Sequence, residues 1–86
     1  MSEDSPVRVL LVDDHTLFRK GLAELLEQRG GITVAGITGN PDEALELLAQ
    51  TQPDAVITDL NMPPHGGLAL LRRIRASEWS GPVLIL

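Results

Sequence analysis

Acidic residues directly follow two apolar stretches of the 86-residue chain. Asp13 and Asp14 come after Val7–Val12 (VRVLLV), and Asp59 comes after Ala55–Thr58 (AVIT). Carboxylates that lie close together repel one another, and a hard divalent cation relieves that repulsion. Mg²⁺ takes oxygen ligands and is commonly held by one or two carboxylates and a phosphate, and a carboxylate beside it can itself become an acyl phosphate. These three residues are therefore candidates for a metal site with a phosphoryl acceptor.

The spacing of apolar residues predicts the elements that position these carboxylates. The stretches Val7–Val12, Ile32–Thr38, Ala55–Thr58 and 82–86 are typical of strands, the first and third being apolar enough to be buried on both faces. Helical spacing covers residues 16–29, with Gly30-Gly31 as its end. A second helix is predicted after the N-cap Asn40 and before Pro53. A third is predicted over residues 67–76, with Leu68, Leu71 and Ile74 facing inward.

The resulting β-α-β-α-β-α-β alternation indicates one parallel sheet with helices on both faces. Ligands of such sheets bind at the carboxyl ends of the strands, where the strand order reverses. If the first and third predicted strands are neighbours, Asp13, Asp14 and Asp59 converge on one edge of the sheet. Any one of these aspartates alone would more simply be a turn or N-cap residue. All three together, each after an apolar strand, favour a functional site.

Composition restricts the classes of function. Twelve acidic against seven basic residues give a net charge of −5, so the chain is a poor stand-alone binder of nucleic acid. The absence of cysteine excludes disulfides and a thiol nucleophile. No secretory signal or membrane-length apolar run is visible, so we expect a cytoplasmic protein with no membrane partner. Residues 1–6 are expected to form a loose N-terminal segment ahead of a single domain over 7–86.

Two motifs resemble the receiver domain of two-component response regulators. LLVDDH resembles the first strand and acidic pair of that family, and AVITDLNMPPHGG resembles the segment around its phospho-accepting aspartate. In the second motif Asp59 is followed by Pro63 after four residues and by Gly67 after eight, and both are expected to shape the loop. DDHTLFRKGL further resembles the NarL/FixJ subfamily, whose receivers precede a LuxR-type DNA-binding domain. The resemblance implies a flavodoxin-like (CheY-like) α/β fold.

The resemblance also implies roles for individual residues. Asp59 would accept a phosphoryl group from a phosphohistidine of a sensor histidine kinase. Asp14 would bind Mg²⁺ directly, Asp13 would act through a coordinated water, and the backbone carbonyl of Asn61 would be a further ligand. The domain would then be a switch rather than an enzyme, with slow self-phosphorylation and self-dephosphorylation only. In the full-length protein it would control an attached DNA-binding transcription-regulator domain.

The chain departs from the family pattern after residue 86. A complete receiver has a Ser or Thr directly after the fourth strand and a Lys at the end of a fifth, whereas no lysine follows Lys20 here. We therefore expect the N-terminal part of a receiver domain, incomplete after the fourth strand. Residues 82–86 would form an apolar edge strand, and such edges invite pairing with another chain. A homodimer through this edge is expected.

Two other functions remain open from the residues. A phosphohydrolase of the haloacid-dehalogenase type also uses a strand-terminal Asp, but it needs Asp-x-Asp, and Asp59-Leu60-Asn61 lacks the second acid. The other alternative is an interaction module that does not depend on phosphorylation. His15 is ordinary for the subfamily and His65 is expected to be an exposed loop residue. Either could bind Zn²⁺ or Cu²⁺ adventitiously, but neither is expected to be a native ligand.

Overall fold

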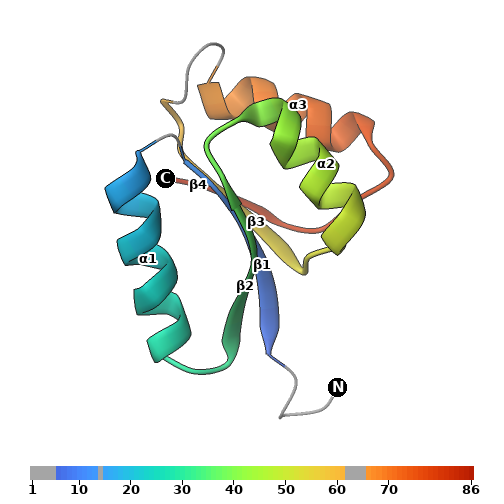
Figure 1. The fold of residues 1–86 in the computed structure, drawn as a ribbon. Helices are drawn as coiled ribbons and strands as arrows, with labels where there is room; N and C mark the ends of the chain where they lie inside the picture. Colours follow the sequence, from blue (N-terminus) through green and yellow to red (C-terminus); the bar gives the residue numbers. More distant parts are fainter. Residues whose placement is uncertain (1–5, 14, 62–65) are drawn as a thin grey trace.

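The computed structural model describes residues 6–13, 15–61 and 66–86, in which strands and helices alternate along the chain (Figure 1). The elements are β1 (Val7–Val12), α1 (Thr16–Gln28), β2 (Ile32–Thr38), α2 (Pro41–Thr51), β3 (Ala55–Thr58), α3 (Gly66–Ala76) and β4 (Val83–Ile85). All strand pairs are parallel, and the order in the sheet is β2-β1-β3-β4. The predicted flavodoxin-like (CheY-like) α/β architecture is confirmed.

Local signals in the sequence explain where the helices begin and end. Gly30 and Gly31 have φ values of +74° and +75°, which glycine adopts without the steric cost that a Cβ would add, and α1 ends just before them. The side chain of Asn40 accepts hydrogen bonds from the backbone N–H groups of Asp42 (2.8 Å) and Glu43 (3.2 Å) at the start of α2. These bonds satisfy two N–H groups that have no partner inside the helix.

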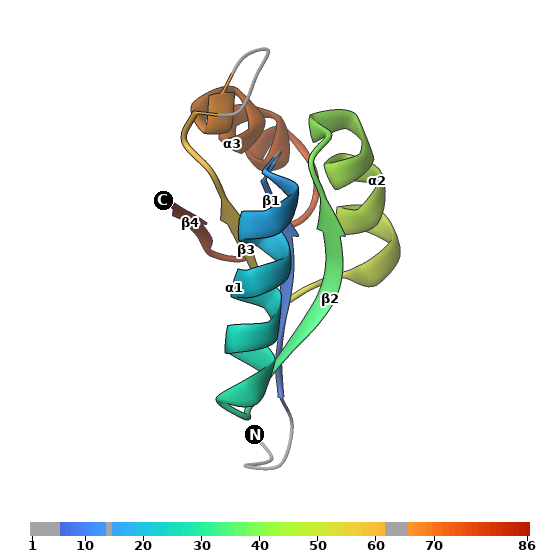
Figure 2. The same cartoon turned by 60° about the vertical axis from the view of Figure 1, so that its left-hand side comes forward.

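The helices lie on both faces of the sheet, with α1 on one side and α2 and α3 on the other (Figures 1 and 2). The main core fills the space between the sheet and the α2/α3 layer. Its buried residues come from β1, β3, α2 and α3: Leu10, Val12, Ala44, Leu48, Val56, Leu70 and Ile74. On the α1 side, Val9, Leu11 and Ala23 are buried. Among the described residues, no helix is both long enough and apolar enough to cross a membrane.

The predicted inward face of α3 is partly wrong. Ile74 is buried as expected, but Leu68 is 55% exposed and Leu70, at 1% exposed, packs in the core instead. The buried row is Gly67, Leu70 and Ile74. The buried glycine explains this orientation, because a residue without a side chain lets the first turn of α3 approach the end of β3 closely.

Candidate functional site

The strand order reverses between β1 and β3, and this is where Asp13 and Asp59 lie. Backbone hydrogen bonds continue the sheet past the ends of both strands. The N–H of Asp13 donates to the carbonyl of Thr38 (2.9 Å), and the N–H of Asp59 donates to the carbonyl of Val12 (3.1 Å). Both aspartates are thus held by their backbones at one edge of the sheet, and the predicted convergence of these two is confirmed.

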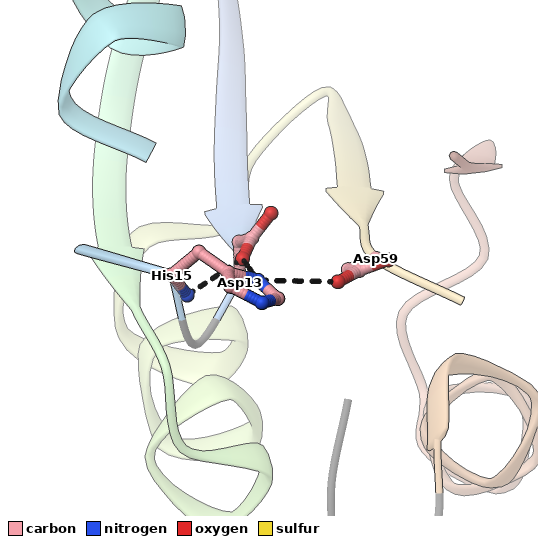
Figure 3. A group of neighbouring side chains, drawn as sticks. All are labelled: Asp13, His15 and Asp59. Atoms are coloured by element: carbon pink, nitrogen blue, oxygen red, sulfur yellow. Dashed lines mark hydrogen bonds and ion pairs between the residues drawn. The ribbon is translucent and has the colours of Figure 1, made fainter. Parts of the chain in front are cut away.

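The ring of His15 faces the carboxylates of both Asp13 and Asp59 (Figure 3). Its Nδ1 atom is 2.9 Å from Oδ1 of Asp13 and 3.6 Å from Oδ2 of Asp59. The backbone N–H of His15 also donates to Oδ1 of Asp13, at 2.7 Å. His15 was not expected to belong to the site. Its place two residues after Asp13, on the loop that leaves the same strand end, was the signal that could have indicated it.

The charges of this cluster suit a cation. The side chain of Asp13 is only 5% exposed and that of Asp59 is 19% exposed, so water screens their mutual repulsion poorly. One ligand atom from each of Asp13, His15 and Asp59 can be chosen so that all lie within 4.8 Å of one another. Carboxylate oxygens at this spacing are donors that hard divalent cations prefer. The acidic pocket is therefore able to bind a metal ion.

Other predicted site residues are only partly described by the structure. The backbone N–H of Asn61 donates to Oδ1 of Asp59 (3.2 Å), so Asn61 lies beside this carboxylate. Its role as a metal ligand through its backbone carbonyl stays a prediction. Asp14, predicted as a direct metal ligand, lies outside the described residues, as do Pro63 and His65.

At Gly67 the first turn of α3 lies against the backbone of Asp59 and Leu60. A Cβ atom at this position would lie 2.4 Å from the carbonyl oxygen of Asp59 and 3.2 Å from Cα of Leu60. The N–H of Gly67 donates to the carbonyl of Leu60 at 2.8 Å, and this bond stabilises the close approach of α3 to the end of β3. Glycine is therefore the residue that lets α3 approach the backbone of Asp59 this closely. The expected role of Gly67 in the loop before it stays a prediction.

Comparison with known proteins supports what the geometry indicates. The family model of the response regulator receiver domain matches residues 9–86. The chain belongs to this family. The nitrate/nitrite response regulator protein NarL of Escherichia coli K12 is 36% identical over 85 residues, which are 99% of this chain and 39% of NarL. A protein-glutamate methylesterase/protein-glutamine glutaminase of Symbiobacterium thermophilum is 42% identical over 80 residues, 93% of this chain and 22% of that protein.

Solved receiver structures have the same fold. A LuxR-family two-component response regulator from Aurantimonas sp. SI85-9A1 superposes with a TM-score of 0.87 and 38% identity, over 94% of this chain and 58% of that chain. The non-phosphorylated receiver domain of the stress response regulator RcsB from Escherichia coli gives 0.84 and 26%, over 95% and 65%. The predicted resemblance to NarL- and LuxR-type response regulators is confirmed. The chain spans less than half of the length of these curated relatives.

Proposed function

We propose that this receiver domain is a phosphorylation switch in which Asp59 accepts a phosphoryl group in a Mg²⁺-dependent reaction. The observation that supports it most directly is the position of Asp59. Its partly buried carboxylate lies at the carboxyl end of β3, within an acidic pocket shared with Asp13, in a chain of the receiver family. A single partly exposed carboxylate beside a cation site is suited to nucleophilic attack on phosphorus.

The chemistry requires little from the protein beyond positioning and charge. A carboxylate oxygen of Asp59 attacks the phosphorus of the donor, an acyl-phosphate P–O bond forms, and the P–N bond of a phosphohistidine breaks, leaving the histidine ring. The N–H of Asn61, which donates to Oδ1 of Asp59, restricts how the carboxylate can rotate. The ladder bond from the N–H of Asp59 to Val12 holds the backbone during the attack.

The pocket fits a magnesium ion by its donor set. We propose that Asp59 and Asp14 bind the ion directly, Asp13 through a water molecule, and Asn61 through its backbone carbonyl. A bound divalent cation supplies the positive charge that neutralises the carboxylates and the transferring phosphoryl group. The near-complete burial of the Asp13 side chain, at 5% exposed, is consistent with a group that acts on the ion rather than on the donor.

The same proposal names the partners. A sensor histidine kinase would supply the phosphoryl group in the cytoplasm, and the receiver would control a LuxR-type DNA-binding domain in the full-length protein. The domain would not be an enzyme toward other substrates, and its only chemistry would be slow self-phosphorylation and self-dephosphorylation.

The test is incubation with Mg²⁺ and acetyl phosphate, followed by intact mass measurement. We expect one phosphoryl group per chain, stable in acid and labile in base, which is absent in Asp59→Asn. The matched control is Asp54→Asn, because Asp54 precedes the same strand at its opposite end. It should label like the wild type. Chelation of the metal should prevent labelling of the wild type and of Asp54→Asn.

The alternative outcomes point to different functions. Multiple turnover of phosphate esters without an accumulating adduct would favour the phosphohydrolase. A folded protein that neither binds Mg²⁺ nor forms the adduct would favour the interaction module. An adduct that persists in Asp59→Asn would refute Asp59 as the acceptor. Transfer from a phosphorylated sensor histidine kinase then tests the physiological donor.

A further inference from the structure

The imidazole of His15 supplies the acidic pocket with a nitrogen donor. It belongs to the segment that follows β1, and its side chain is 65% exposed, whereas both carboxylates that it contacts are much more buried. This exposure means that packing does not force the ring against the carboxylates. Two carboxylate oxygen atoms face the ring, Oδ1 of Asp13 at 2.9 Å and Oδ2 of Asp59 at 3.6 Å from Nδ1.

The Nδ1 atom occupies a place where a cation is favoured. An ionised carboxylate offers oxygen lone pairs, which can accept a hydrogen bond or bind a metal ion. A divalent ion bound among these atoms would take one ligand atom from each of Asp13, His15 and Asp59.

The spacing suits a small transition-metal ion. Ligands about 2.0–2.2 Å from a metal lie roughly 2.9 Å apart at a right angle and about 3.4 Å apart at the tetrahedral angle. The two Nδ1–oxygen distances, 2.9 and 3.6 Å, are close to these values. The exposed ring of His15 can adjust to an ion, and the three ligand atoms already lie within 4.8 Å of one another.

We propose that Asp13, His15 and Asp59 form a site for borderline transition-metal ions, such as Zn²⁺ and Co²⁺, with His15 as a direct nitrogen ligand. Imidazole favours these ions, whereas Mg²⁺ prefers oxygen donors. The site shares its two carboxylates with the proposed magnesium site. Its location therefore rests on the proposed function, but metal binding through His15 does not require phosphoryl transfer.

The test compares Zn²⁺, Co²⁺ and Mg²⁺ binding to the 86-residue chain by titration calorimetry at one fixed neutral pH. His15→Asn keeps a polar side chain of similar reach but removes the imidazole. Loss of a ligand should weaken Zn²⁺ and Co²⁺ binding by about tenfold or more, since even residues that only orient ligands contribute this much. Mg²⁺ binding should change by less than about twofold, because that ion does not depend on nitrogen. The matched control is His65→Asn, at the other histidine of the chain, and it should bind all three ions like the wild type.

A second measurement on the wild type removes any dependence on the folding of the variants. The ring nitrogen signals of the two histidines can be resolved by NMR, and Zn²⁺ should shift those of His15. Equal Zn²⁺ affinity of His15→Asn and wild type, or unchanged His15 nitrogen signals, would overturn the proposal. Equal weakening of Mg²⁺ and Zn²⁺ would also overturn it, because His15 would then only position the carboxylates. Failure of acetyl phosphate labelling, with the Zn²⁺ difference intact, would refute the phosphorylation switch alone.

Discussion

Replacing Gly67 with alanine should disturb both the stability of the fold and the acceptor site. The added Cβ would lie 2.4 Å from the carbonyl oxygen of Asp59, at least 0.6 Å inside the 3.0 Å that real Cβ contacts respect. The atoms that the new Cβ would meet belong to the backbone of Asp59 and Leu60, so no flexible side chain can move aside. The first turn of α3 must therefore separate from the end of β3, or Asp59 must shift away from Asp13.

The cost can be estimated from similar overpacking. Inserting a methyl group into a tightly packed, buried position costs about 1–3 kcal/mol. With a urea m value of about 1 kcal/mol/M for a domain of this size, the unfolding midpoint should fall by roughly 1–3 M. Because a misplacement near one ångström also disturbs attack geometry, phosphorylation of Asp59 by acetyl phosphate should slow by about tenfold or more.

The assay can use the only tryptophan of the chain, since there is no tyrosine. Trp79 is half-buried against the core, and its Nε1–H donates to the carbonyl of Pro53 (2.8 Å), so its fluorescence reports global unfolding. Gly21→Ala is the matched control. Position 21 lies within α1, and no described atom beyond its chain neighbours and the backbone of its own helix lies within 4 Å of a new Cβ. The change should therefore raise the unfolding free energy by up to about 1 kcal/mol. A Gly67→Ala protein with the wild-type midpoint and labelling rate would refute the steric argument.

Three further predictions concern stability and association. Asp59→Asn should raise the unfolding free energy of the metal-free protein by about 1 kcal/mol in urea titrations, because it removes the repulsion from Asp13; a loss of stability would contradict this. Asn40→Ala should lower the unfolding free energy by about 1 kcal/mol through loss of the two N-cap bonds, whereas Arg73→Ala, which breaks only an exposed ion pair, should cost under about 0.5 kcal/mol. Strand β4 pairs only with β3 among the described strands, and Leu84 on it is 56% exposed, so we expect a homodimer in sedimentation velocity that Leu84→Lys weakens; a stable wild-type monomer at high concentration would refute it.

The location of the site could be predicted from the sequence because it depends on backbone topology. Apolar strands that end in Asp13 and Asp59 must be buried in a parallel sheet, and adjacent parallel strands bring their carboxyl ends to one edge. The boundaries of the elements follow from residues with strong local preferences, such as Gly30 and Asn40. Neither inference requires knowledge of where a side chain points.

Details that depend on contacts between distant residues could not be predicted. Helical spacing alone does not distinguish the row that begins at Leu68 from the row that begins at Gly67, because the close contact with Asp59 decides it. The guanidinium of Arg8 donates to the carbonyls of Thr51 and Gln52 at the end of α2, a contact across more than forty residues that no local pattern indicates.

The position of the His15 side chain is likewise a detail that the backbone topology alone does not determine. Ladder bonds to Thr38 and Val12 hold the backbones of Asp13 and Asp59, so the two residues cannot separate without breaking the sheet. The compensating charge must therefore come to them. In the metal-free protein the exposed ring of His15 faces both carboxylates, and a bound cation would neutralise them. The pairing of β1 with β3 thus keeps the two carboxylates close together, and their mutual repulsion favours a bound cation.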